Sequence, residues 1–177
     1  MGWEFDWLYC LQKIHTPWLD QLMVKITSLA DHGQFWILLG LAFLCFKKSR
    51  KIGIAVIASL ILSVLIGNVI LKNLVARSRP CWIDESVALL IQNPRDYSFP
   101  SGHTLASFTS SVSICLQNRR WGILAVGLAA LIAFSRLYLF VHFPTDVLGG
   151  AAFGTASALF IYWVMKRKGL FLQKEGG

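Results

Sequence analysis

Residues 52–71 form a run of 20 residues without a charged side chain, between Lys51 and Lys72. A helix of about 20 apolar residues crosses the hydrocarbon core of a bilayer. In lipid the backbone must satisfy its own hydrogen bonds, so such a run is expected to be helical. Of the 177 residues 55% are hydrophobic and 15% are charged, against about 25% charged residues in soluble domains. We therefore predict an integral membrane protein of the all-α class.

Four further segments complete a predicted bundle of about five transmembrane helices, residues 33–168, in a single domain. The first contains Phe35–Phe46, which is too short to cross alone, so its span must begin near Leu29 or thin the bilayer locally. The other three are Ser101–Gln117, Trp121–Phe140 and Val147–Met165. In the last of these, Gly150 and Gly154 stand at GxxxG spacing, which favours close helix packing.

Residues 1–32 precede the bundle and mix apolar with charged side chains. On both sides of Pro17 the apolar residues recur at three- and four-residue spacing, which is typical of amphipathic helices. We expect these helices to lie at the membrane surface. The alternative is that the second helix is the tilted start of the first transmembrane span.

Many of the basic residues stand in three clusters that separate or follow the predicted spans. With five spans all three clusters lie on one side, which the positive-inside rule assigns to the cytoplasm. The N-terminal segment and loop 73–100 then lie outside, and residues 169–177 form a cytoplasmic tail. The net charge of +8 is thus a topology signal, and we expect no nucleic-acid partner. The clusters are Lys47, Lys48, Arg50 and Lys51; Arg119 and Arg120; and Lys166, Arg167 and Lys168.

Other polar residues gather at three helix ends on the predicted outer side. Lys72, Arg79 and Arg136 can neutralise and hydrogen-bond phosphate oxygens, arginine with a bidentate fork. Ser101 stands where a helix is expected to begin, and the free amides of a first helical turn bind anions. Gly102 lets an anion approach that backbone closely. We therefore predict that these five residues bind a phosphate group.

Two histidines and an aspartate accompany these groups. Pro144 is a favoured first helical residue, which places Asp146 in the first turn of the following helix. There Asp146 is expected to hold one ring nitrogen of His142 and leave the other as a nucleophile. His103 is expected to protonate a leaving oxygen. Each element alone is common as a helix cap or an interfacial anchor, but their joint occurrence on one face of the membrane indicates a single site.

Together the three elements resemble the signature of the type 2 phosphatidic acid phosphatase superfamily, KxxxxxxRP, PSGH and SRxxxxxHxxxD. Every defining position is present between Lys72 and Asp146. The resemblance implies a phosphatase that needs no metal or other cofactor and works through a phosphohistidine. By that analogy His142 is the nucleophile, Asp146 orients it and His103 is the general acid. The phosphoryl oxygens would be held by Lys72, Arg79, Ser101, Gly102 and Arg136.

The resemblance further implies hydrolysis of a lipid phosphate at the outer face of the cell membrane. The small size, the short loop and the five-span plan are similar to the bacterial undecaprenyl-diphosphatase branch, so undecaprenyl diphosphate is the expected substrate. Phosphatidylglycerophosphate and phosphatidic acid phosphatases share the signature and remain alternatives, as does a non-catalytic lipid-binding protein. Arg77 and Arg95 are outside the signature and are expected to face water or contact a second phosphate. Cys81 is expected to be accessible from outside the cell, and the oligomeric state stays open.

Overall fold

The computed structural model describes residues 2–170, and this part of the chain contains helices and loops but no strand. The predicted all-α membrane bundle is thereby confirmed. The predicted tail, residues 169–177, falls outside the described residues from position 171 on. The elements are α1 (Gly2–Gln12), α2 (Pro17–Ser28), the 3-10 turn η1 (Asp31–Gly33), α3 (Gln34–Cys45), α4 (Arg50–Ser63), the π-helical η2 (Val64–Leu71), α5 (Lys72–Val75), α6 (Pro80–Ile83), α7 (Gly102–Cys115), α8 (Arg119–Tyr138) and α9 (Pro144–Arg167).

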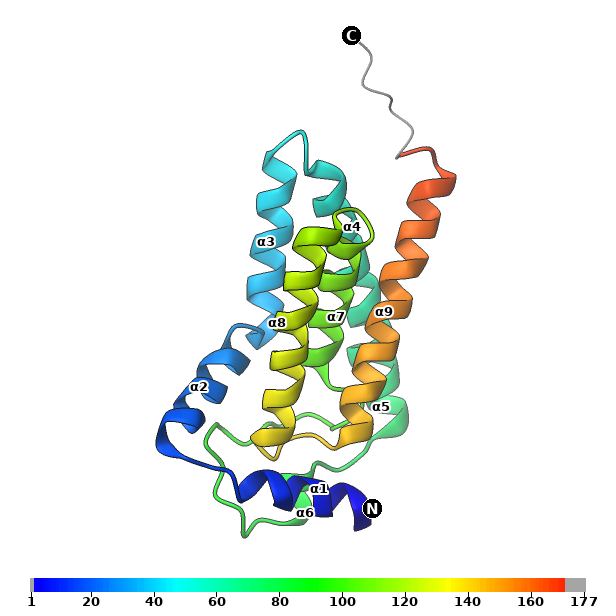
Figure 1. Cartoon of the computed structure of the whole chain (residues 1–177). Helices are drawn as coiled ribbons and strands as arrows, with labels where there is room; N and C mark the ends of the chain where they lie inside the picture. The colour runs from blue at the N-terminus through cyan, green and yellow to red at the C-terminus, as the bar shows by residue number, and fades with distance from the viewer. Residues whose placement is uncertain (1, 171–177) are drawn as a thin grey trace.

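The helices α3, α4, α7, α8 and α9 run lengthwise through the bundle in alternating directions (Figure 1). α7 contacts all four of the others, which makes it the centre of the bundle. Two glycines of α9 face it: a Cβ at Gly154 would lie 2.6 Å from the carbonyl oxygen of Leu105, and one at Gly150 would lie 2.8 Å from that of Ser101. The close packing predicted for the GxxxG pair is therefore present between α7 and α9.

Three helical stretches are long and apolar enough to cross a bilayer, namely Arg50–Ile83, α8 and α9. A fourth candidate is α2 together with η1 and α3, bent by 42°, so the alternative in which the second N-terminal helix starts the first span fits the structure. α7 has 14 residues, or about 21 Å of helix, which is shorter than the roughly 30 Å hydrocarbon core. A serine of α7 is hydrogen-bonded to a neighbouring helix: the Trp36 indole of α3 donates to Ser107 Oγ at 2.9 Å. The bundle therefore has more helices than candidate spans, because α7 is too short to be counted as one.

α1 lies across one end of the bundle (Figure 1). Its inner face is buried, since Leu8 is 0% and Glu4 5% exposed. Phe5 packs edge-on against Phe143, with ring centroids 5.3 Å apart. Trp3 and Trp7 are exposed, as expected of a helix at a membrane interface, where aromatic rings are favoured. The interfacial position itself stays a prediction.

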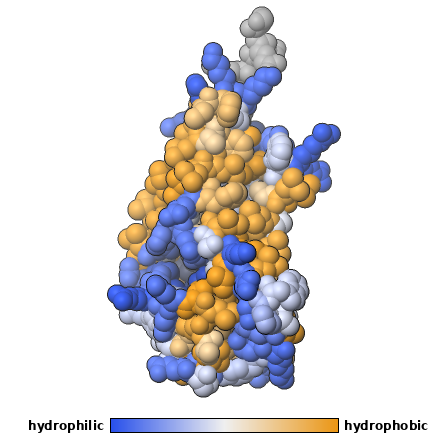
Figure 2. Space-filling model, turned by 90° about the vertical axis from the view of Figure 1, so that its left-hand side faces the viewer, coloured by the Kyte–Doolittle hydropathy of each residue, from blue (hydrophilic) through white to orange (hydrophobic). Residues whose placement is uncertain are grey.

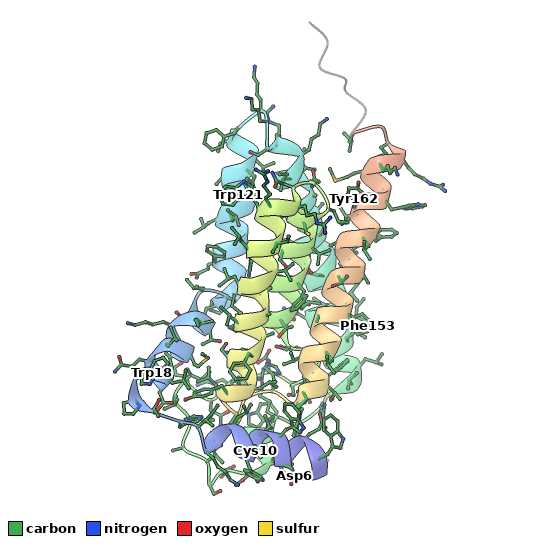
Figure 3. All side chains as sticks on the ribbon, in the orientation of Figure 1. Asp6, Cys10, Trp18, Trp121, Phe153 and Tyr162 are labelled. Carbon is green, nitrogen blue, oxygen red and sulfur yellow. The ribbon has the colours of Figure 1, made fainter. Side chains whose placement is uncertain are left out.

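The two ends of the bundle differ in charge. The three basic clusters lie at the α3–α4 connection, at the α7–α8 connection and at the end of α9, all at one end (Figure 1). We term this the basic end, and the opposite end, covered by α1 and loop 84–101, the site end. Trp121 and Tyr162 mark the basic end in Figure 3, and Asp6 and Cys10 the site end. Hydrophobic side chains cover much of the surface shown in Figure 2, and hydrophilic ones gather around a hollow in its lower half.

Candidate active site

A cavity of about 850 Å³ lies at the site end, between η1, η2, the start of α7 and loop 84–101. Six of the eight predicted site residues line it. The other two, Ser101 and Asp146, are fully buried beside the lining residues. The fold therefore gathers three sequence elements into one place. The six lining residues are Lys72, Arg79, Gly102, His103, Arg136 and His142.

His142 stands in the short α8–α9 connection and is 1% exposed. Arg79 Nη1 lies 3.0 Å from the imidazole Nε2. Because a guanidinium only donates, Nε2 carries the lone pair and Nδ1 the proton. Burial and the guanidiniums of Arg79 and Arg136 hold the pKa of His142 well below its usual range, so the ring is neutral at neutral pH. An unprotonated Nε2 beside the cavity's cations is what a histidine nucleophile requires.

Asp146 lies behind the other ring nitrogen, with Oδ2 3.6 Å from His142 Nδ1. Ser98 bridges this gap: its hydroxyl donates to Asp146 Oδ2 and lies 3.4 Å from Nδ1. The Phe143 amide donates to the same carboxylate oxygen at 2.8 Å, which fixes the carboxylate. As predicted, Pro144 begins α9 and Asp146 occupies its first turn. Sequence reasoning missed Ser98, because a lone serine in a loop belongs to no pattern.

Lys72 and Arg79 both hold the carboxylate of Asp96. Lys72 Nζ pairs with Oδ2, and Arg79 Nη2 donates to Oδ1 at 2.7 Å. Burial would raise the pKa of Asp96, but its hydrogen bonds and ion pairs with Lys72 and Arg79 lower it to about 2. The carboxylate thus occupies the pair of cations predicted to bind phosphate. Sequence reasoning missed Asp96, because an acid is not a phosphate ligand; its position shortly before the PSGH element is the one available signal.

Arg136 lies in the last turn of α8 and reaches the cavity with a side chain that is almost fully buried. Its Nη1 donates to Thr27 Oγ1 at 2.6 Å, whereas its Nε has no hydrogen-bond partner. A buried donor without a partner is costly. A phosphate oxygen in the cavity would satisfy it. Thr27, which lies in α2, was not predicted as part of the site.

α7 begins at the cavity, with Ser101 in the N-cap position. The Ser101 hydroxyl does not cap the helix; it accepts from Thr104 Oγ1 at 3.0 Å, and Ser101 is not among the residues that line the cavity. The first amides of α7 are therefore without a side-chain cap and suit an anion. A Cβ at Gly102 would stand 3.3 Å from Asn68 Oδ1 and 3.9 Å from Lys72 Nζ. Glycine keeps this space beside the lysine open.

His103 follows in the first turn of α7, and its Nε2 pairs with Asp31 Oδ1 at 2.9 Å. Because a carboxylate only accepts, Nε2 carries a proton. A general acid needs such a proton within reach of the leaving group. Asp31, in η1, is a further residue that no sequence motif marked.

Two expectations about residues outside the signature need correction. Arg77 does not face water: its Nη1 donates to Asp146 Oδ1 at 2.8 Å and its Nη2 to Glu4 Oε2 at 2.6 Å. Arg95 is exposed and lines the cavity, which keeps contact with a second phosphate open. The expected accessibility of Cys81 is wrong, because its side chain is packed inside the site end and is 3% exposed.

The charges of the cavity suit an oxyanion. Its lining includes four cationic side chains, those of Lys72, Arg79, Arg95 and Arg136, and such donors bind phosphate oxygens strongly. Within residues 2–170, no group of three His, Cys, Asp or Glu side chains comes together as metal ligands.

Comparison with known proteins identifies the family. The model of the PAP2 superfamily matches residues 52–170. An undecaprenyl-diphosphatase of Sulfolobus acidocaldarius is 38% identical over 140 residues, which cover 77% of this chain and 66% of that protein. Undecaprenyl-diphosphatase BcrC of Bacillus subtilis is 35% identical over 139 residues, which cover 76% of this chain and 69% of that protein. The chain thus spans about two thirds of the length of these relatives.

Two solved structures share the fold. A transmembrane PAP2-type phosphatidylglycerolphosphate phosphatase from Bacillus subtilis superposes with a TM-score of 0.76 at 24% identity, over 94% of this chain and 86% of that one. Aquifex aeolicus LpxE gives a TM-score of 0.80 at 25% identity, over 92% and 96%. The family match covers more than half of the chain and contains every residue of the three motifs. The chain therefore belongs to the PAP2 superfamily of membrane phosphatases.

Proposed function

We propose that the protein is a lipid phosphatase that transfers a phosphoryl group from a membrane lipid to His142 and then to water. One observation carries this proposal: the unprotonated Nε2 of His142 stands 3.0 Å from Arg79 Nη1, at a cavity that Lys72 and Arg136 also line. Fixed cations around a neutral nucleophile stabilise the charge on phosphoryl oxygens during attack. The first amides of α7, from Gly102 on, hold a further phosphoryl oxygen. Ser101 takes part in this as the N-cap residue from which α7 begins.

In the first step, Nε2 of His142 attacks phosphorus and the bond to the leaving oxygen breaks. His103, in its imidazolium form, donates its Nε2 proton to that oxygen and becomes a neutral ring. Asp146, with Ser98, holds the Nδ1 proton and stabilises the positively charged phosphoimidazole. In the second step, water attacks phosphorus, His103 accepts a proton of that water, and His142 leaves as a neutral ring. The scheme needs no metal.

The substrate that we propose is undecaprenyl diphosphate, hydrolysed to undecaprenyl phosphate. The two undecaprenyl-diphosphatases described above support this choice. The cavity also has an apolar wall, formed by Val24, Ile37, Leu60, Val64 and Leu105. If the prenyl chain packed against this wall, the diphosphate group of the same lipid would lie beside Lys72, Arg79 and Arg136. Phosphatidylglycerophosphate and phosphatidic acid are the competing substrates.

We further propose that the site end faces the outside of the cell, because the basic end carries the residues expected in the cytoplasm. Two native cysteines test this orientation. Cys10 on α1 and Cys45 at the end of α3 are both exposed and lie at opposite ends. A membrane-impermeant maleimide should label Cys10 in intact cells and reach Cys45 only after permeabilisation. The reverse pattern would refute the orientation.

The reaction is tested by phosphate release from the purified protein in detergent, with EDTA present. Undecaprenyl diphosphate, phosphatidylglycerophosphate and phosphatidic acid are compared at equal concentration, and we expect the first to be hydrolysed fastest. An acid-labile, base-stable phosphoenzyme should form in the wild type and be absent from His142→Ala. His15→Ala, which alters a histidine that does not line the cavity, is the matched control. Loss of activity with EDTA, or persistence of activity in His142→Ala, would refute the mechanism.

A further inference from the structure

We propose that Glu4 and Arg77 are positioning residues for this reaction, and that α1 is thereby a working part of the active site. The proposal rests on the proposed function. Arg77 joins two carboxylates, with Nη1 on Asp146 Oδ1 at 2.8 Å and Nη2 on Glu4 Oε2 at 2.6 Å. Asp146 in turn faces Nδ1 of His142. Four side chains thus form one chain of contacts from the N-terminal helix to the nucleophile.

Because Glu4 is buried, its ion pair with Arg77 is part of the packed interior and is not a solvent-exposed surface pair. Its side chain is 6% exposed, and that of Asp146 is 0% exposed. A buried carboxylate needs a cation and hydrogen-bond donors. Glu4 finds both: besides Arg77, the Thr145 hydroxyl donates to its Oε1 at 2.7 Å. Phe143 holds the guanidinium from another side, with Arg77 Cζ 4.1 Å from its ring centroid.

The arrangement also has an electrostatic consequence for the reaction. Arg77 fixes Oδ1 of Asp146, so that Oδ2 stays directed at Ser98 and His142. A lone arginine would offset the negative charge that Asp146 presents to the nucleophile. Glu4 compensates for that arginine, so the three groups together keep one net negative charge. This charge opposes the positive ring that forms when His142 takes up phosphate.

Because both residues act through Asp146, they should affect the chemical step and not substrate binding. We expect Glu4→Gln to lower kcat about 10-fold, the scale that the loss of a charge-assisted hydrogen bond supplies. KM should stay within about two-fold of the wild type. Arg77→Met should lower kcat further, and Arg77→Lys should restore part of it, because lysine keeps the charge but cannot bridge both carboxylates.

The control is Asp6→Asn, which removes the same charge from the exposed face of the same helix (Figure 3). It should leave kcat and KM unchanged. Glu4→Gln with Arg77→Met completes a double-mutant cycle, and the combined loss should be smaller than the product of the two single losses. Thermal unfolding in detergent identifies any variant that fails to fold. Glu4→Gln keeps the shape of the residue, so it tests the proposal even if Arg77→Met does not fold.

The outcomes separate this inference from the proposed function. A wild-type protein that forms no phosphoenzyme refutes the proposed function itself. A wild type that forms phosphoenzyme, together with Glu4→Gln that matches it in kcat, refutes only the role of Glu4 and Arg77. A rise in KM with unchanged kcat, or independent effects in the cycle, would also overturn the positioning role.

Discussion

The Asp96 carboxylate occupies two of the cations that we propose bind the phosphate of the substrate. It pairs with both Lys72 and Arg79, two of the residues predicted to hold phosphate. A phosphate group must therefore displace Asp96 before it can bind. We predict that Asp96→Asn binds oxyanions more tightly than the wild type, because the amide is neutral and leaves both cations free.

The magnitude follows from the exposure of the pair. The Asp96 side chain is 56% exposed, so its ion pairs are partly screened by water. Exposed pairs contribute up to about 1 kcal/mol each, so releasing the two should strengthen oxyanion binding by about 1 kcal/mol, or roughly five-fold. The assay is the inhibition constant of orthovanadate against hydrolysis of a short-chain lipid phosphate. Asp84→Asn is the matched control, since Asp84 stands in the same loop but bonds Tyr9 and Ser86.

The pH dependence of this competition has a definite sign. The ion pairs lower the pKa of the Asp96 carboxyl from 3.8 to about 2. The ionised Asp96 carboxylate therefore stabilises the folded protein fully above pH 3.8, and this stabilisation is lost as the pH falls through about 2. Across the neutral range Asp96 stays ionised, so the ratio of inhibition constants should not change with pH. Weaker vanadate binding by Asp96→Asn would refute the reasoning and show that Asp96 orients the cations.

Three further substitutions test the packing and the site. Gly154→Ala places a methyl group 2.6 Å from a backbone oxygen of α7 and should destabilise the protein by about 1–3 kcal/mol. Thermal unfolding checks this against Gly127→Ala, where the added methyl group would meet no atom within 4 Å beyond its own stretch of helix. Gly102→Ala should lower kcat/KM about 10-fold by crowding the anion site at the α7 start, and a KM that stays unchanged would argue against that crowding. Asp31→Asn should slow hydrolysis of lipids with poor leaving groups more than that of p-nitrophenyl phosphate, because His103 loses the carboxylate that fixes its proton. Equal losses on both substrates would count against that role.

The residues of the three motifs could be selected from the sequence because charge is rare in so apolar a chain. Lys72, Arg79, Arg136 and His142 stand out for that reason, and their motif spacing assigned each a role before any distance was known. Ser101 was placed correctly at a helix start, yet its hydroxyl accepts from Thr104 and does not cap the helix. A side-chain direction depends on packing, which motif spacing does not describe.

The partners of these residues could not be found in the same way. Glu4, Thr27 and Asp31 lie before the matched family region and follow no motif, and in the sequence they read as ordinary polar residues of amphipathic helices. Each reaches the site through a contact across more than 70 residues of chain: Glu4 to Arg77, Thr27 to Arg136 and Asp31 to His103. Such contacts exist only once α1, α2 and η1 have docked on the bundle.

The sequence by itself determined the class of fold, the charge difference between the two ends and the family, because hydrophobic run length, basic clusters and motif spacing are properties of the linear chain. The tertiary structure decided the rest. It made α7 a short central helix, paired Asp96 with Lys72 and Arg79, and directed Nε2 of His142 toward Arg79. It also brought Glu4 to Arg77 and so to Asp146. The physical reason is that burial, hydrogen-bond direction and ion pairing depend on distances between residues far apart in sequence, and only the packed helices set those distances.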